Sequence, residues 1–115
     1  MNARHHAVGK RQCQGKTPLH AAARSGNHKC LSLLLQHGAP VEISDGEGLT
    51  PLFLAAGFND RNKCVKVLLE HGAYINARAP EGHTPLMAAT TNGMLNNSEV
   101  LLAHDPDIDI RDVEV

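Results

Sequence analysis

Residues 15–23 read Gly15-Lys16-Thr17-Pro18-Leu19-His20-Ala21-Ala22-Ala23, and the same pattern returns twice along the 115-residue chain. The triplet Thr-Pro-Leu begins at positions 17, 50 and 84, and an alanine pair follows each copy. A leucine-rich segment comes next in each copy, and a His-Gly-Ala segment closes the first two copies at residues 37–39 and 71–73. Because several registers repeat together, the pattern predicts an array of similar structural units.

Each unit is predicted to contain two helices. In the first unit Thr17 can cap a helix and Pro18 suits the first helical position, so a helix is expected over residues 18–25. Gly26 can end that helix, and a second helix is expected over residues 28–36 before Gly38. The connectors at residues 39–49 and 73–83 contain Pro, Gly, Asp and Asn, which favour turns. The sequence therefore predicts an all-α chain of helix-turn-helix units.

Two segments carry a family resemblance: residues 15–23 and His71-Gly72-Ala73-Tyr74-Ile75-Asn76-Ala77. Over about residues 15–112 the chain resembles the ankyrin-repeat family. The resemblance implies an ankyrin-repeat solenoid with projecting β-turn or hairpin loops and a concave face that binds proteins. It divides the chain into repeats at residues 15–47, 48–81 and 82–115, the last with an acidic C-terminal tail.

Residues 1–14 are interpreted as a remnant or extended loop of a preceding repeat, because Asn2-Ala3-Arg4 matches Asn76-Ala77-Arg78. Whether the chain is a fragment or an isoform of a longer array is left open. The second repeat has one extra residue near Asn59-Asp60, which lengthens the turn between its helices. The third repeat has Asn97 and Ser98 where the others have Cys and an apolar residue, which predicts a partly polar outer face acting as a C-terminal cap.

The composition favours a small helical domain in a reducing compartment. Hydrophobic residues make up 42% of the chain, but only one Tyr, two Phe and no Trp are among them. The core must therefore be formed mainly by Ala, Leu, Val and Ile. Three cysteines are an odd number, which argues against a disulfide framework and for a cytoplasmic or nuclear location. Cys30 and Cys64 occupy equivalent positions and are expected to be buried. No apolar run approaches the ~20 residues of a membrane span.

The charges are divided along the chain. Residues 1–41 hold six basic residues and no acidic one, whereas residues 99–115 hold six acidic residues and a single Arg. This separation predicts that an acidic segment of a partner protein is drawn to the first repeat.

Eight histidines raise the question of a metal site. Three histidines occupy the same position in successive repeats: His37, His71 and His104. Packed helices lie roughly 8–10 Å apart, so these side chains are expected to be too far apart to bind one zinc ion. Each is expected to lie at the end of a helix. His20 is expected, from the resemblance, to brace the neighbouring turn, where Phe53 and Met87 replace it in the other repeats. His5, His6 and Cys13 lack a fourth ligand of recognised spacing. No phosphate loop or nucleophile motif is present, so we expect neither enzyme activity, nor a metal, nor a cofactor.

The predicted function is protein-protein interaction, as a monomeric adaptor or scaffold. The resemblance places the concave face at Arg11, Gln14, Lys16, Arg24, Ser25, Ser44, Glu47, Leu49, Phe58, Arg78, Glu81, His83, Thr91 and Asn92. Phe58 and Leu49 are the preferred anchors, because they are apolar residues at positions that are normally solvated. Alternatively, Phe58 only covers the enlarged turn of its own repeat.

Two other functions stay open. The chain could be a structural segment of a longer scaffold with no binding of its own. Its basic N-terminal end could contact nucleic acid, although the pattern lacks stacking aromatic residues and a DNA-binding motif. Separately, Asn76 with Leu68 upstream is similar to sites on ankyrin repeats that asparaginyl hydroxylase modifies, although Tyr74 replaces the usual acid.

Overall fold

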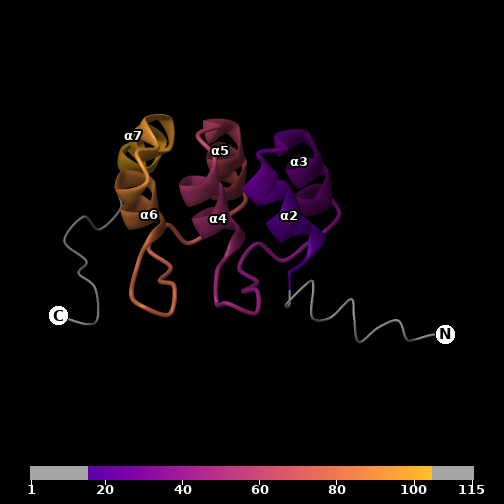
Figure 1. Cartoon of the computed structure of the whole chain (residues 1–115). Coiled ribbons are helices and arrows are strands. Elements are labelled where there is room, and N and C mark those ends of the chain that lie inside the picture. Colours follow the sequence, from indigo (N-terminus) through magenta and orange to yellow (C-terminus); the bar gives the residue numbers. More distant parts are fainter. Residues whose placement is uncertain (1–15, 105–115) are drawn as a thin grey trace.

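The computed structural model describes residues 16–104, which form a row of three helix pairs (Figure 1). The helices are α2 Pro18–Ser25, α3 His28–Gln36, α4 Pro51–Phe58, α5 Asn62–Glu70, α6 Pro85–Thr91 and α7 Leu95–Ala103. We call α2 with α3 the first pair, α4 with α5 the second and α6 with α7 the third. No strand occurs within residues 16–104, and the bounds of α2 and α3 coincide with the predicted ranges. The prediction of an all-α helix-turn-helix array is confirmed.

The first helix of each pair begins with the same cap. The hydroxyls of Thr17, Thr50 and Thr84 each accept the backbone N–H three residues on, at 3.3, 3.3 and 3.2 Å, and proline follows each threonine. Proline costs nothing there because the first N–H of a helix has no partner within the helix. Gly26 then ends α2 with φ of 81°, a left-handed conformation that suits glycine.

Small residues set the spacing of the row. The helix α4 packs between α2 and α6, and the alanines at these contacts, Ala23, Ala55, Ala56 and Ala89, are fully buried. A methyl group added at Gly57 would lie 3.1 Å from the Cβ of Ala88, so α4 and α6 approach closely there. The second helices α3, α5 and α7 pack through larger buried residues such as Leu31, Leu68 and Leu101.

Two connecting loops project from one side of the row (Figure 1). Loop 1 (residues 37–50) folds back where the N–H of Asp45 donates to Leu49 O at 2.9 Å, and loop 2 (residues 71–84) does so where Ala79 donates to His83 O at 2.8 Å. The two loops touch, because a Cβ at Gly48 would lie 2.6 Å from the Pro80 ring. Glycine at this position, with φ of 81°, therefore allows loop 2 to pack on loop 1.

Side chains of the longer turn in the second pair form hydrogen bonds to a helix end in each neighbouring pair. The side-chain amide of Asn59 donates to Ala23 O at 3.2 Å and to Arg24 O at 2.8 Å, at the C-terminal end of α2. Asp60 accepts the N–H groups of Asn96 and Asn97 at the start of α7, whose own cap residue provides no side-chain bond. Asn59 and Asp60 in this longer turn therefore join the three pairs.

Two burial predictions are wrong. Cys30 is exposed, because it lies on the outer side of the first pair, which no other described helix pair covers. Its counterpart Cys64 is buried, as predicted. Asn97 does not form an outer polar face: it is fully buried and its amide donates to Ala55 O, Ala56 O and Asn59 O at 3.2, 2.9 and 2.6 Å. The half-buried Ser98 lies on a surface lined by the third pair alone.

None of the helices within residues 16–104 has the length and apolar character needed to cross a membrane.

Candidate protein-binding surface

His20 braces loop 1 from the first helix, as predicted. Its buried ring accepts the N–H of Thr17 on Nδ1 at 3.0 Å, and Nε2 lies 3.0 Å from Ile43 O and 3.1 Å from Leu49 O. A neutral imidazole with its proton on Nε2 satisfies these partners, because Nδ1 must accept while Nε2 donates to the carbonyls. Loop 1 is thereby tied to α2 at Ile43 and Leu49.

A buried carboxylate fixes the same loop. Asp45 Oδ1 accepts the N–H groups of Glu47 at 2.8 Å and Leu49 at 3.0 Å, and Lys16 Nζ lies 3.4 Å from Oδ2. Burial acts to raise the pKa of Asp45, but the N–H groups of Leu49 and Glu47 and the Lys16 ammonium outweigh it, so the pKa is below its ordinary value. Lys16, predicted to meet a partner, is thus paired with Asp45 and only partly exposed.

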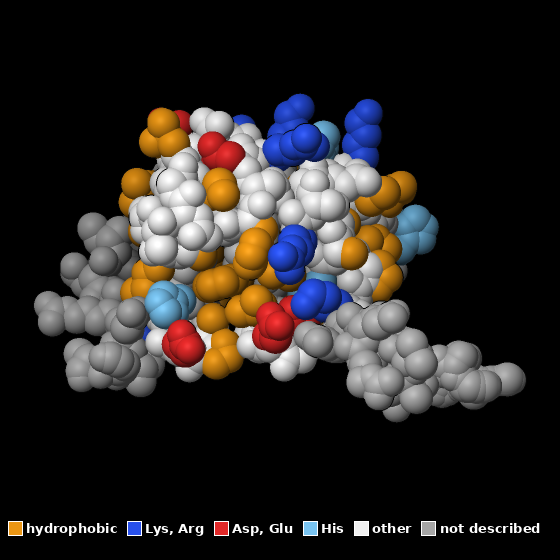
Figure 2. Space-filling view, in the orientation of Figure 1, with side chains coloured by type: hydrophobic (Ala, Val, Ile, Leu, Met, Phe, Trp, Pro, Cys, Tyr) orange, Lys and Arg blue, Asp and Glu red, His pale blue; other side chains and the backbone are white. Residues whose placement is uncertain are grey.

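A groove opens between the two loops. Its volume is about 450 Å³, and its lining consists of Glu47, Leu49, Phe53, Ala79, Pro80, Glu81 and His83. Four of these, Glu47, Leu49, Glu81 and His83, belong to the concave face predicted from the sequence. Three of the lining residues were not predicted from the sequence: Phe53, Ala79 and Pro80. A signal was present for Phe53, because this aromatic residue stands where the first repeat has the bracing His20. In Figure 2 acidic side chains lie at the lower edge, over the loops, with hydrophobic side chains between and above them.

Phe58 and Arg24 form a second part of the predicted face. The Phe58 side chain remains 44% exposed at the end of α4, and the Arg24 guanidinium carbon lies 4.4 Å from the ring centroid. This cation–π contact joins the first and second pairs. Phe58 therefore contacts the neighbouring pair and still presents apolar surface to solvent.

Other predicted residues lie apart from the groove. Ser25 lines an open, mostly apolar pocket with a volume of about 490 Å³ on the outer side of the first pair. Its hydroxyl donates to Ala22 O at 3.3 Å. Asn92 is engaged within the row, because its amide donates to Gly57 O at 2.9 Å. The remaining predicted residues are exposed on the loops or on α6, namely Ser44, Arg78 and Thr91. Arg11 and Gln14 lie outside the described residues.

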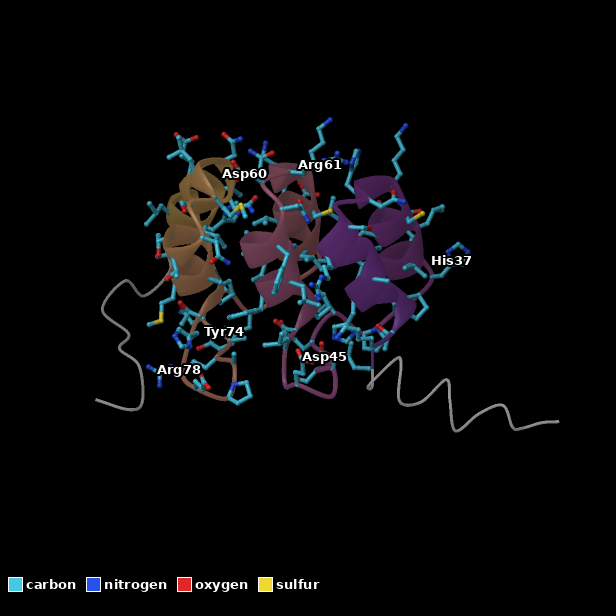
Figure 3. All side chains as sticks on the ribbon, in the orientation of Figure 1. His37, Asp45, Asp60, Arg61, Tyr74 and Arg78 are labelled. Atoms are coloured by element: carbon cyan, nitrogen blue, oxygen red, sulfur yellow. The ribbon has the colours of Figure 1, made fainter. Side chains whose placement is uncertain are left out.

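Loop 2 carries the proposed modification site. Asn76 is half-buried, and the exposed Tyr74 precedes it by two residues. The backbone N–H of Tyr74 donates to the carboxylate of Glu42, which links loop 2 to loop 1. In Figure 3 Tyr74 and Arg78 lie on loop 2, while Asp45 lies on loop 1.

The three histidines of common register close helices, as expected. Nδ1 of His37, His71 and His104 lies 2.9, 3.0 and 3.0 Å from the carbonyl four residues back. At Leu33 O and Val67 O the ring adds to a backbone contact, because the N–H groups of His37 and His71 donate to the same carbonyls at 3.1 Å. Within residues 16–104 no three His, Cys, Asp or Glu side chains gather in a way that could hold a metal ion, and His5, His6 and Cys13 lie outside that range.

Comparison with known proteins agrees with this architecture. Residues 2–79 and 43–112 match the family model described as Ankyrin repeats (3 copies). Human ankyrin repeat domain-containing protein 13C is 43% identical over 58 residues, which are 50% of this chain and 11% of that protein. Ankyrin repeat domain-containing protein 37 of Xenopus tropicalis is 40% identical over 55 residues, 46% of this chain and 34% of that protein. The rice potassium channel AKT1 is 44% identical over 48 residues, 42% of this chain and 5% of the channel.

The matched part of the chain thus spans about a tenth of the first of these relatives, while the family model covers nearly the whole sequence. Given the repeated caps, the alanine contacts between pairs and this match, the chain belongs to the ankyrin-repeat family.

Proposed function

We propose that the chain is an adaptor or scaffold module that binds another protein through the side formed by the loops and by α2, α4 and α6. The observation that carries this proposal is the groove between loops 1 and 2, which brings Glu47, Leu49, Glu81 and His83 together. Ankyrin repeats generally act in protein-protein interaction, through extended concave surfaces. We assign no catalytic step to the chain. Its odd number of cysteines supports the cytosol or nucleus as its site of action.

Phe58 and Leu49 are the proposed anchors. Aromatic side chains that a partner can bury are enriched among the residues that dominate binding energy. Phe58 meets this condition because it is 44% exposed and its ring is oriented by Arg24. Leu49 is half-buried, so its exposed part contributes to the groove while the rest packs against the core.

We further propose that the partner carries an acidic segment, which the basic first repeat attracts. Two exposed cations on the first pair support this: Arg24 and Lys29. Among the described residues neither of them forms an ion pair, whereas Lys16 is paired with Asp45. The positive charge of Arg24 and Lys29 is therefore available to attract an acidic partner.

The test compares two single substitutions in a partner-capture experiment. Phe58→Ala removes the proposed anchor, whereas Leu102→Ala removes an apolar side chain that is 50% exposed on α7, away from the loops and first helices. We expect proteins captured by the original chain to be lost with Phe58→Ala and retained with Leu102→Ala. Equal capture by both variants, with helix content unchanged, would show that the partner does not use this side of the row.

A further inference from the structure

The groove between the loops holds two carboxylates, and the residues that line it include no Lys or Arg. Glu47 lines it from loop 1 and Glu81 from loop 2, and the Glu81 side chain is 86% exposed. A His83 ring nitrogen lies 3.9 Å from the Glu81 carboxylate. Within residues 16–104 neither glutamate forms an ion pair with a lysine or an arginine. The rim of the groove is therefore negative and open to a cation.

The remaining lining is apolar. Leu49, Phe53 and Pro80 contribute hydrophobic side chains, and Ala79 adds a small one between the loops. Lysine and arginine fit such a combination, because their methylene stems pack on apolar surface while their charged heads reach outward to carboxylates. The Phe53 ring also offers a face that attracts a cation. An acidic side chain would meet like charge here, and a wholly apolar one would leave both carboxylates without a counterion.

We infer that the groove between loops 1 and 2 binds a lysine or arginine side chain of an extended partner segment, with an apolar residue beside it. This inference rests on the proposed function and specifies the chemistry of the partner at one position. It concerns a different part of the surface from the acidic contact proposed above, since the exposed cations Arg24 and Lys29 lie on the helices of the first pair.

Together the two contacts give the partner segment a direction. In Figure 2 the red acidic side chains at the lower edge lie over the loops, and the blue basic side chains lie mainly above them. A segment with its cation in the groove and its acidic residues toward the helices matches both charges. The reverse orientation places like charges against each other at both contacts.

The test uses a phage-displayed library of random 12-residue peptides, selected against the whole chain at low salt. Selected peptides are synthesised with a fluorescent label and measured against Glu47→Gln, Glu81→Gln and the double variant. The control is Glu70→Gln, which removes the same charge from an exposed residue at the end of α5, outside the groove. Circular dichroism verifies that all variants keep their helix content.

We expect Lys or Arg at one enriched position, next to an apolar residue, in the selected peptides. Each groove substitution should weaken binding about two- to fivefold and the double variant more, because exposed ion pairs contribute modestly. Glu70→Gln should leave affinity unchanged. Replacing the enriched cation in the peptide by norleucine should abolish the difference between the original chain and the double variant.

Selection of acidic or uncharged peptides, or equal affinity of the double variant, would overturn the inference while leaving partner capture through Phe58 intact. Self-association of the chain that the double variant loses would assign the groove to a second copy and also overturn it. Absence of any bound peptide, with no partner captured through Phe58, would reject both the inference and the proposed function.

Discussion

Asp60 in the turn of the second pair accepts the backbone N–H of Asn97 in α7 at 3.1 Å. The same carboxylate accepts the N–H of Asn96 at 3.3 Å. The start of α7 is therefore capped by a residue of the neighbouring pair, and this contact has a measurable effect on stability.

Asp60→Ala should lower the free energy of unfolding by about 0.5–2 kcal/mol, the usual effect of removing a helix cap. Asp60→Asn keeps an oxygen acceptor and should lose less. Urea denaturation followed by circular dichroism measures both variants. If alanine and asparagine give the same midpoint as the original chain, α7 does not depend on this cap.

Asp45 should make stability depend on pH. Its pKa in the folded chain is below the ordinary value of 3.8, so the charged carboxylate stabilises the fold above that value. This contribution is lost as the pH falls through the lowered pKa, since the unfolded chain then binds the proton more readily. Unfolding at a series of pH values should show this decline, and Asp45→Ala should be about 1–3 kcal/mol less stable at neutral pH. In that variant the acid-dependent decline should be smaller; an identical pH profile would contradict the role of Asp45.

Ala55→Leu should destabilise the row by about 1–3 kcal/mol through overpacking. Ala55 is fully buried in α4, which packs against α2 and α6, so three added carbons have no space. An exposed alanine in α2 supplies the control, because Ala21→Leu adds the same volume where solvent is available. A denaturation midpoint unaffected by Ala55→Leu would show that the helices can separate at little cost.

Asn76 should gain one oxygen atom on incubation with asparaginyl hydroxylase, its iron cofactor and its co-substrates. Its half-buried side chain would have to leave its place in loop 2 to enter an enzyme, so modification should be slow unless loop 2 opens. Intact-mass measurement detects the added oxygen, and Asn76→Gln identifies the position. An unchanged mass would refute the expectation.

Charge reversal on the first repeat should slow association with the captured partner. Arg11→Glu with Arg24→Glu should lower the association rate roughly tenfold at low ionic strength, because long-range attraction steers an acidic segment. Lys16 is left unchanged because it holds Asp45. Lys63→Glu with Lys66→Glu, both on α5, makes the same change in net charge away from the first repeat. Equal rates for the two double variants would show that the first repeat is not the docking end.

The helices could be predicted from local signals. Thr17, Pro18 and Gly26 act on backbone groups within a few residues, so the range of α2 followed from the sequence directly. The bracing role of His20 came from the family resemblance and is confirmed by its contacts with Ile43 O and Leu49 O.

Contacts between pairs were harder to predict. A position in the repeat defines a register, but not which of the neighbouring pairs covers it, so Cys30 was wrongly expected to be buried and Asn97 to face outward. The cap that Asp60 provides joins residues 36 and 37 positions apart, which no local pattern indicates. Pro80 was missed in the groove for the same reason: its contact with Gly48 depends on how the two loops pack.

The anchors of loop 1 have no equivalents at the corresponding positions of loop 2. His20 and Asp45 fix loop 1, whereas Phe53 and Ala79 occupy their places in the next repeat. The wall of the groove formed by loop 1 is thus held by side chains whose counterparts are missing at the same positions of the other wall. Preorganised surfaces lose less entropy on binding. We therefore expect strict selection of the residue that meets Glu47 and Leu49, and tolerance of varied residues on the opposite side, so that a family of related segments can share this site.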